Sequence, residues 1–367
     1  MPYTPKVGDK ISDLDTPSMI VSIPHMESNI KKLFSKLKSS NPSILIRPHL
    51  KTTKSAHLAK LLVSNGATGG CCAKLSEAEV LIPLGFTDLL ITCEIIGPVK
   101  VRRLVELWRQ NKGTRIVVDS EEGVRGLEEG MKDEEGELLT LIDLDVGLHR
   151  TGVQPGEPSL KLAKLVAESK HLKLIGVQGY EGHLQHLHSF EERKSLCLES
   201  MNTLVQTAEE FRKDGHNIEV VTTGGTGTAE FCITVPGVTE VQPGSFLFMD
   251  TDYRNAVGSF FENTLTIVST VISKQAPKIV TIDAGLKSLT TDSGLAECKA
   301  PGYTYGVLGD EHGSLSWTDA PDLNVGDRVE MIPSHIDPTI NLHDFYYAHR
   351  DGVVEEIWAV DARGKVQ

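Results

Sequence analysis

The stretch LLTLIDLDV, residues 138–146, is apolar along most of its length and carries two aspartates near its end. Such runs are typical of strands buried on both faces, as in a parallel sheet covered by helices. Seven similar runs occur at 43–50, 66–72, 88–94, 115–120, 172–180, 217–225 and 238–248. Segments with apolar residues three and four apart separate them, such as SAHLAKLLVSNG at 55–66. Eight strands alternating with helices predict an α/β fold, a closed (β/α)₈ TIM-like barrel, although a doubly wound open sheet shares this rhythm.

The rhythm changes after residue 255, where alternating apolar and polar runs follow one another with little helix between them. These runs lie at 264–274, 278–285, 327–334 and 353–366. Alternation of this kind indicates a second, mainly antiparallel β domain. The early run SMIVSIP, 18–24, is one strand too many for the barrel and is expected to pair there. We therefore predict a barrel over 25–255 and a β domain over 256–367 plus 1–24.

Composition excludes several classes of protein. The 367 residues are 40% hydrophobic and 24% charged, which is ordinary for a globular protein, and the net charge of −13 argues against a nucleic-acid partner. Six cysteines without CxxC spacing fit a reducing compartment. The N-terminal stretch lacks the apolar core of a signal peptide, and no apolar run approaches ~18 residues. We expect a cytoplasmic protein without a membrane partner.

In a barrel, reactive groups gather at the C-terminal ends of the strands. The stretch RPHLKTTKS, 47–55, follows an apolar run directly and brings Arg47, His49 and Lys51 to such an end. Two interpretations stay open at this point. Either the strand has simply reached water, or it aims a lysine into a pocket.

The stretch VVTTGGTGTAE, 220–230, follows the seventh strand, where barrels often bind phosphate. Gly224 and Gly225 let backbone N–H groups approach an anion, and the hydroxyls of Thr223 and Thr226 add donors. An ordinary turn is the alternative.

Histidines follow the sixth strand in GYEGHLQHLH, 179–188. Tyr180, His183, His186 and His188 at the end of a barrel strand suit acid–base chemistry or ligand binding. Simple exposure is the other interpretation of each ring.

The stretch PSHIDPTINLHD, 333–344, contains His335 and Asp337. If the segment is extended, both side chains lie on one face, about 7 Å apart at their α-carbons. One imidazole and one carboxylate suit a divalent cation such as Mn²⁺, Mg²⁺ or Zn²⁺. A single HxD motif is a weak signal by itself.

These features place a lysine at one strand end and a phosphate-binding loop at another, with histidines and a candidate cation site nearby. Pyridoxal phosphate needs such a combination: a Schiff-base lysine, a phosphate site and groups that polarise the ring. The sequence as a whole resembles a known family, the D-threonine aldolases. These have the alanine-racemase-like barrel fold (fold type III) and are related to the eukaryotic-type D-serine dehydratases. The resemblance spans residues 13–355 and rests on RPHLKTTKS, LIDLDVGLHRTGV, TGGTGT, EVQPGSFLFMD, IDAGLKSL and HIDPTINLHD.

The resemblance implies an aldolase that uses pyridoxal 5′-phosphate and a divalent cation, with Mn²⁺ or Mg²⁺ favoured. The small-molecule substrate would be D-threonine or a related D-3-hydroxy amino acid, cleaved to glycine and an aldehyde. The related enzymes resemble head-to-tail homodimers. The implied residues are Lys51 as the cofactor lysine, Arg150 at its ring, Thr223, Gly224, Gly225 and Thr226 at its phosphate, Tyr180 and Gln242 in the pocket, His186 at the substrate hydroxyl, and His335 and Asp337 at the metal.

Two features of the sequence depart from the family pattern. Thr53 replaces a histidine in the opening motif, and Cys93 stands where asparagine is expected before Glu94. By the same resemblance, Lys54 is expected on the following helix and outside the pocket. The alternatives to the aldolase are a dehydratase acting on D-serine or 3-hydroxyaspartate and a non-catalytic pyridoxal phosphate carrier.

Overall fold

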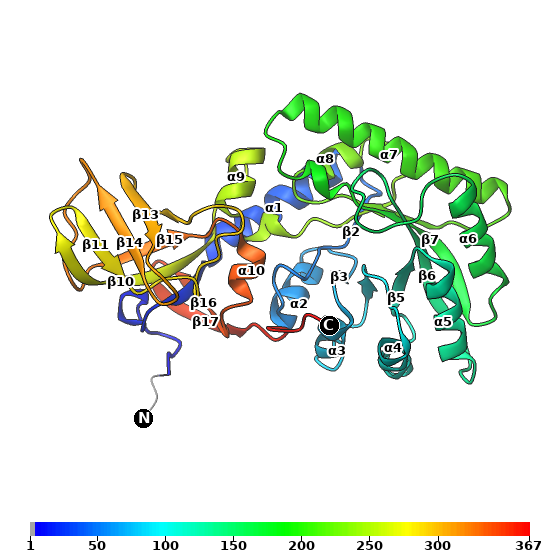
Figure 1. The fold of residues 1–367 in the computed structure, drawn as a ribbon, viewed down its shortest axis with the longest axis horizontal. Helices are drawn as coiled ribbons and strands as arrows, with labels where there is room; N and C mark the ends of the chain where they lie inside the picture. Colours follow the sequence, from blue (N-terminus) through cyan, green and yellow to red (C-terminus); the bar gives the residue numbers. More distant parts are fainter. Residues whose placement is uncertain (1–3) are drawn as a thin grey trace. The chain divides into compact units, whose positions relative to one another are not determined.

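The computed structural model describes residues 4–367, and the chain divides into two compact units. The barrel unit comprises residues 33–51, 58–244 and 365–367. The β unit comprises the chain through Lys32, residues 52–57 and residues 245–364. Helix α1 (Ile23–Ser40) contributes residues to both units (Figure 1).

Eight parallel strands form the sheet of the barrel unit. They are β2 (Leu45–Ile46), β3 (Gly70–Cys72), β4 (Leu89–Ile91), β5 (Arg115–Val118), β6 (Leu138–Leu144), β7 (Leu172–Gly179), β8 (Val220–Thr223) and β9 (Glu240–Val241). Their order is β2-β9-β8-β7-β6-β5-β4-β3. The two end strands also meet, because Cys71 N–H donates to Pro48 O and Leu50 N–H donates to Cys71 O, at 2.9 and 2.7 Å. The predicted eight-stranded barrel is confirmed.

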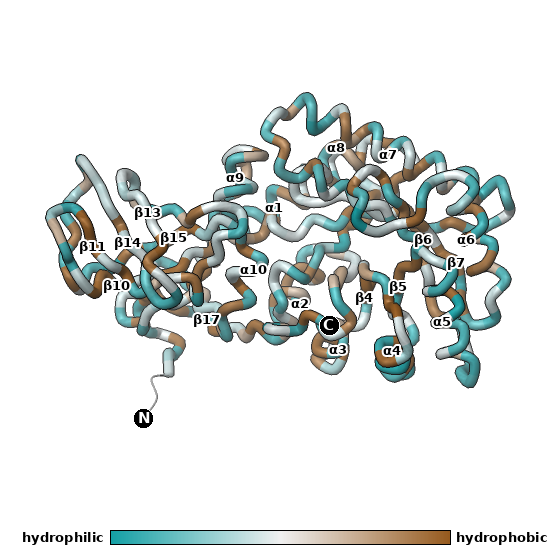
Figure 2. The backbone as a smooth tube through the Cα atoms, in the orientation of Figure 1, coloured by the Kyte–Doolittle hydropathy of each residue, from teal (hydrophilic) through white to brown (hydrophobic). Residues whose placement is uncertain are grey.

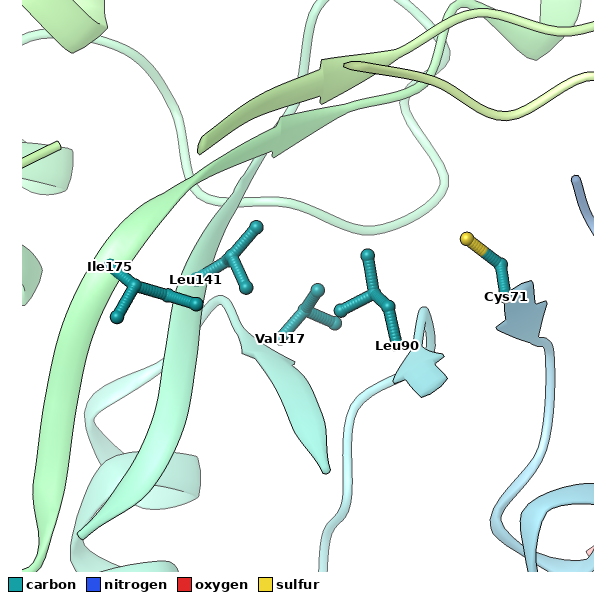
Figure 3. Close-up of a cluster of buried hydrophobic side chains, with 5 residues drawn as sticks. All are labelled: Cys71, Leu90, Val117, Leu141 and Ile175. Carbon is teal, nitrogen blue, oxygen red and sulfur yellow. The ribbon is translucent and has the colours of Figure 1, made fainter. Parts of the chain in front are cut away.

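The apolar runs form the strands because each contributes side chains to a common core. Five consecutive strands, β3 to β7, supply one buried residue each: Cys71, Leu90, Val117, Leu141 and Ile175 (Figure 3). Four of the five are fully excluded from solvent, and Ile175 is 7% exposed. Burial of this kind stabilises the fold by about 1.5–3 kcal/mol per large aliphatic side chain.

Helices follow the strands of the barrel unit. They are α2 (Ala56–Ser64), α3 (Leu75–Leu81), α4 (Pro98–Gln110), α5 (Glu121–Met131), α6 (Glu157–Glu168), α7 (Phe190–Lys213) and α8 (Ala229–Cys232). Helix α5 illustrates the local cause: Ser120 Oγ accepts the N–H of Gly123, and Val124, Leu127 and Met131 form one buried stripe. The longest of them, α7, alternates hydrophilic and hydrophobic residues along its length (Figure 2). No helix within residues 4–367 is both long and apolar enough to cross a membrane.

The β unit contains a nine-stranded sheet that is mainly antiparallel. Its strands are β1 (Ser18–Ser22), β10 (Leu265–Ala276), β11 (Ile279–Ile282), β12 (Glu297–Cys298), β13 (Tyr303–Val307), β14 (Gly313–Trp317), β15 (Arg328–Ile332), β16 (Phe345–Arg350) and β17 (Val353–Ala359). Their main order is β13-β14-β11-β10-β1-β16-β17, and β15 pairs with both β10 and β12. Two short helices, α9 (Thr251–Val257) and α10 (Ile336–Ile340), accompany this sheet.

The early strand β1 pairs within this sheet, as the sequence predicts. It runs antiparallel to β10, with Val21 opposite Leu265, and parallel to β16, with Ile20 opposite Tyr347. Strand β1 is therefore an interior strand, although it comes from the start of the chain.

Candidate active site

The turn after β2 carries Lys51 to the end of the barrel where the strands' C-termini emerge. Lys51 is half-buried in this turn. His49 Nε2 lies 3.1 Å from Thr92 Oγ1, and that hydroxyl donates to the carbonyl of Cys72 at 3.1 Å. These contacts join the turn to the ends of β3 and β4. Lys51 therefore lies where barrel enzymes place reactive groups.

Arg47 has a different environment from the one its position at the strand end suggests. Its guanidinium is fully buried, donating from Nε to Glu240 Oε2 at 2.8 Å and from Nη1 to Asp88 Oδ1 at 2.7 Å. Burial alone would lower the pKa of Arg47, but the adjacent Glu240 and Asp88 carboxylates raise it above its usual value. Asp88 precedes β4, so the guanidinium turns toward the N-terminal ends of the strands. Arg47 is an internal ion-pair residue, not a member of the polar cluster at the C-terminal ends.

The expectation that Lys54 lies on the following helix is wrong. Lys54 precedes α2, which begins at Ala56, and it adopts a left-handed backbone with φ of 48°. Its side chain is only 7% exposed, and Nζ lies 3.5 Å from the carbonyl oxygen of Ala362. The left-handed turn aims the side chain inward, where Nζ donates a hydrogen bond to that carbonyl. Lys54 is buried within the β unit rather than displayed on a helix.

The glycine loop after β8 is buried and tightly packed. Gly224 has φ of +80°, which favours glycine. A Cβ on Gly225 would lie 2.4 Å from Gln185 Oε1, so a larger residue does not fit. Gly225 N–H donates to Thr228 Oγ1 at 3.1 Å and Gly227 N–H to Gln185 Oε1 at 2.9 Å. Thr223 and Thr226 flank the two glycines and are also buried.

A structured loop after β6 presents Arg150. Asp145 holds this loop by accepting the N–H groups of Gly147 and His149, both at 3.0 Å. Burial opposes ionisation, but these hydrogen bonds lower the pKa of Asp145 to about 2. The guanidinium of Arg150 lies over the Tyr180 ring, with its carbon 5.6 Å from the ring centroid. The two predicted pocket residues therefore lie together at the ends of β6 and β7.

A hydrogen-bonded chain of polar side chains crosses the same end of the barrel. Gln242 Nε2 donates to Thr222 Oγ1 at 2.8 Å and to Gln178 Oε1 at 3.2 Å. Gln178 Nε2 in turn donates to Asp143 Oδ1 at 2.8 Å. This chain places Gln242 next to β7 and β8, as its expected place in the pocket requires.

Asp143 and Glu94 form a pair of interacting carboxyl groups. Burial and the neighbouring Glu94 raise the pKa of Asp143 to about 8, although Gln178 and Thr151 donate hydrogen bonds to it. Burial likewise raises the pKa of Glu94, with a contribution from Asp119. Two carboxylates this close cannot both ionise easily, so the pair holds a proton at neutral pH.

Of the histidines of 179–188, His183 lies in 3₁₀ helix η2 (Gly182–Leu184), and His186 and His188 lie in the turn between η2 and α7. His183, His186 and His188 are all exposed in this structure. Exposure leaves His186 in contact with water, which suits a group that exchanges protons. No position for a substrate follows from this alone.

The expected metal pair lies in the β unit within a group of carboxylates. His335 Nδ1 lies 2.5 Å from Asp292 Oδ2, and this contact lowers the pKa of Asp292 against the opposing effect of burial. Burial raises the pKa of Asp250 to about 6, and the nearby Asp337 carboxylate adds to that shift. One imidazole among three carboxylates is a set of nitrogen and hard oxygen donors.

The segment around His335 and Asp337 is not extended as expected. His335 itself has an extended backbone, but helix α10 begins at Ile336. Asp250 Oδ2 accepts the N–H of Ile336 at 3.0 Å, which satisfies an amide at the helix start. Pro338 lies in the first turn, where its missing N–H is not needed. The two expected ligands therefore flank a helix start and do not alternate along a strand.

Sequence reasoning missed four buried or clustered polar residues: Glu181, Gln185, Asp250 and Asp292. Glu181 directly follows Tyr180, so a carboxylate just past a strand end was a visible signal. Within residues 4–367, one group of three residues has potential metal-ligating atoms close to one another, and it consists of Glu181, Cys197 and Cys232. The Glu181 oxygens accept hydrogen bonds from Thr223 and Gln185, at 3.0 and 3.3 Å.

Two family models match the chain. The alanine racemase N-terminal domain matches residues 21–252, and a putative serine dehydratase domain matches residues 264–349. The chain therefore belongs to the alanine-racemase-like barrel enzymes, a class that depends on pyridoxal phosphate.

Relatives define the family more closely. The chain is 36% identical to a D-threonine aldolase of an Arthrobacter species, over 99% of this chain and 97% of the relative. It is 34% identical to a 3-hydroxy-D-aspartate aldolase of Paracoccus denitrificans, over 96% and 93%. A D-threo-3-hydroxyaspartate dehydratase of a Delftia species is 29% identical, over 89% and 92%.

A solved structure agrees with these relatives. The D-threonine aldolase of Filomicrobium marinum superposes with a TM-score of 0.94 at 34% identity, over 100% of both chains. A structure of the dehydratase of Delftia is described as metal-free, which indicates metal use in the family. The chain is a member of the D-threonine aldolase family, whose members are lyases.

Proposed function

We propose that the protein is an aldolase that cleaves D-threonine and related D-3-hydroxy amino acids to glycine and an aldehyde. The observation that carries this proposal is the chemistry of the donor set at His335, where Asp292 contacts Nδ1 and a carboxylate residue, Asp337, follows two residues later. Such a set suits Mn²⁺ or Mg²⁺. The 36% identity to a D-threonine aldolase supports it.

The barrel residues fit pyridoxal 5′-phosphate. The loop keeps glycine at 225, because a Cβ there would lie 2.4 Å from Gln185 Oε1, and it leaves the end of β8 where barrels often bind phosphate. Arg150 and Tyr180 offer a cation and a ring at neighbouring strand ends, and Lys51 offers an amine at a third. When bound, the cofactor supplies an electron sink for breaking a bond next to an amino group.

Each residue has a distinct role in the proposal. Lys51 Nζ is the amine that would hold the cofactor covalently. Arg150 and Tyr180 orient the cofactor's ring, and Gln242 lines the same pocket. The loop formed by Thr223, Gly224, Gly225 and Thr226 binds its phosphate.

The proton and metal roles fall to other residues. The His186 imidazole accepts the proton of the substrate's β-hydroxyl, which cleavage of the neighbouring carbon–carbon bond requires. His335 and Asp337 would hold the cation, and Asp292 fixes the orientation of the imidazole through Nδ1. A divalent cation supplies a Lewis acid for a substrate oxygen.

A dehydratase acting on 3-hydroxyaspartate is the second candidate, supported by the Delftia relative at 29% identity. Solved variants of that enzyme change a histidine and a cysteine two residues apart. In this chain the residue two after His335 is Asp337, a harder ligand than a thiolate. The donor chemistry therefore favours the aldolase.

The products decide between the two activities. We would incubate the protein with D-threonine, L-threonine and D-3-hydroxyaspartate, following aldehyde, glycine, keto acid and ammonia. An aldolase yields glycine and an aldehyde from the D-isomer only. Keto acid and ammonia as the main products would overturn the aldolase proposal in favour of the dehydratase.

The role of Lys51 is tested by borohydride reduction of the loaded protein followed by peptide mapping. The adduct should map to Lys51 and be absent in Lys51→Ala, which should also lose activity by more than a thousandfold. The exposed lysine variant Lys60→Ala should retain both. An adduct on Lys54 or Lys287 would overturn the assignment.

The metal role is tested by chelation and by a substitution. EDTA should abolish aldehyde release, and added Mn²⁺ should restore it. Asp337→Ala should lose Mn²⁺ affinity, measured by electron paramagnetic resonance, while Asp319→Ala, an exposed aspartate of the same unit, should not. Undiminished cleavage after chelation would exclude the assigned role.

We also propose that the protein forms a homodimer. A dimer suits this chemistry because an active site covered by a second subunit excludes water from the reacting groups. Light scattering should give a mass near twice the 40.1 kDa of one chain. A fully active monomer would contradict the proposal.

A further inference from the structure

A buried carboxylate lies behind the glycine loop. Glu181 is fully excluded from solvent, and its contacts reach both ends of the loop. Its Oε2 accepts the hydroxyl of Thr223, the last residue of β8, at 3.0 Å. Its Oε1 accepts the hydroxyl of Thr228, on the far side of the glycines. One side chain therefore fixes where the loop leaves the strand and where it ends.

Thr228 is the centre of this arrangement. Its oxygen accepts the N–H of Gly225 at 3.1 Å and the amide of Gln185 at 2.8 Å. Since both acceptor positions are filled, its own proton must go to Glu181. The directions of these three hydrogen bonds at Thr228 are therefore determined.

Gln185 holds the middle of the loop. It is 1% exposed, and its Oε1 accepts the N–H of Gly227 at 2.9 Å. It also occupies the space beside Gly225 and Gly227 that any Cβ there would need. Arg193 Nε adds a bond to the carbonyl of Gly227 at 3.0 Å. The glycines are thus required by what packs behind the loop, and the loop has a fixed shape before any ligand binds.

We infer that Glu181, Gln185 and Thr228 are positioning residues that hold the loop 224–227 in the shape that binds the phosphate group of the cofactor. The inference rests on the proposed function, since it assumes that the ligand is a phosphorylated pyridoxal. A preorganised loop gains affinity because its ordering entropy is spent during folding. Removing the hydroxyl of Thr228 leaves a buried amide, a buried carboxylate and Gln185 each short of one partner.

The test compares two ligands that differ only in phosphate. Pyridoxamine 5′-phosphate and pyridoxamine both lack the aldehyde, so neither forms a covalent bond with Lys51. Calorimetry with the full chain, stripped of cofactor, gives the Kd of each. Thr228→Val, which keeps the shape but lacks the hydroxyl, should weaken pyridoxamine 5′-phosphate at least tenfold and pyridoxamine less than twofold. Thr228→Ser should restore affinity to within threefold of the unchanged protein.

A matched control and a second variant complete the design. Thr203→Val removes a hydroxyl that bonds only its own helix, at the carbonyl of Glu199, and should leave both affinities unchanged. If Thr228→Val does not fold, Gln185→Met, which deprives Gly227 N–H of its acceptor, should give the same selective loss.

Two outcomes separate the inference from the function beneath it. Equal loss of both ligands, or no loss of either, overturns the positioning role while the unchanged protein still prefers the phosphorylated ligand. An unchanged protein that binds neither ligand overturns the proposed function itself.

Discussion

Two of the buried glutamates of the barrel unit, Glu240 and Glu181, have opposite surroundings. Glu240 is 1% exposed and faces the cation of Arg47, whereas Glu181 is fully buried among neutral hydroxyls and an amide. The first arrangement joins strands: Arg47 follows β2, Glu240 begins β9, and Asp88 precedes β4. The second joins a strand end to a loop. The buried Glu240 carboxyl group thus has a cationic partner that holds strands together. The buried Glu181 carboxyl group has neutral hydrogen-bond donors that hold a loop in shape.

The largest expected effect breaks the first arrangement. Arg47→Met leaves Glu240 charged, buried and without its cation, so the free energy of unfolding should fall by about 3–5 kcal/mol. Urea denaturation followed by circular dichroism measures it. Arg109→Met, the same change in a surface ion pair with Glu134, should cost much less stability.

A double variant sharpens this prediction. Arg47→Met combined with Glu240→Leu removes both charges and should recover most of the lost stability, because two apolar side chains replace the pair. If the double variant is as unstable as Arg47→Met alone, packing rather than an unpaired charge explains the loss.

A smaller effect is expected at the second arrangement. Glu181→Gln keeps the shape but weakens the bonds from Thr223 and Thr228, so unfolding should need about 1–2 kcal/mol less. Glu199→Gln on the exposed face of α7 should change stability by less than about 0.5 kcal/mol. A loss at Glu181 as large as that at Arg47 would mean that both carboxylates serve the barrel alike.

Asp143 shows a third way to bury a carboxyl group, by keeping its proton. Its pKa is about 8 in the folded protein and near 4 in an unfolded chain, so folding takes up a proton between these pH values. Stability therefore falls as pH rises through that window. As pH rises from 5 to 8, the free energy of unfolding of Asp143→Asn should rise by at least about 1 kcal/mol relative to that of the unchanged protein. A difference that stays constant with pH would show that Asp143 is ionised throughout.

Much of the fold could be predicted because burial on both faces leaves a direct trace in the sequence. The eight apolar runs became β2 to β9, and the alternating runs formed the β unit. The extra strand β1 was recognisable since the barrel had no place for it. The start of helix α10 is harder to predict from the sequence. Asp337 and Pro338 favour the first turn of a helix, and His335 directly before that turn has an extended backbone.

The site was predictable only in part because residue type does not fix side-chain direction. Lys51 and Arg47 follow the same strand, but only the structure shows that Arg47 turns to Asp88 and Glu240. The residue type of Lys54 likewise did not show that its side chain turns inward, toward the carbonyl of Ala362. Glu181 escaped notice because its partners, Thr223 and Thr228, come from a segment more than forty residues away.

The position of β1 also has a consequence for how the chain is made. Ser22 pairs with His349, 327 positions later, so the partner strand β16 emerges from the ribosome long after β1. At about 5–20 residues per second, that delay lasts roughly 15–65 seconds. During this time one edge of β1 has no β16 beside it, and unpaired edges attract other strands. Slow translation between the two strands lengthens that exposure, so synthesis rate influences how much chain reaches the native state.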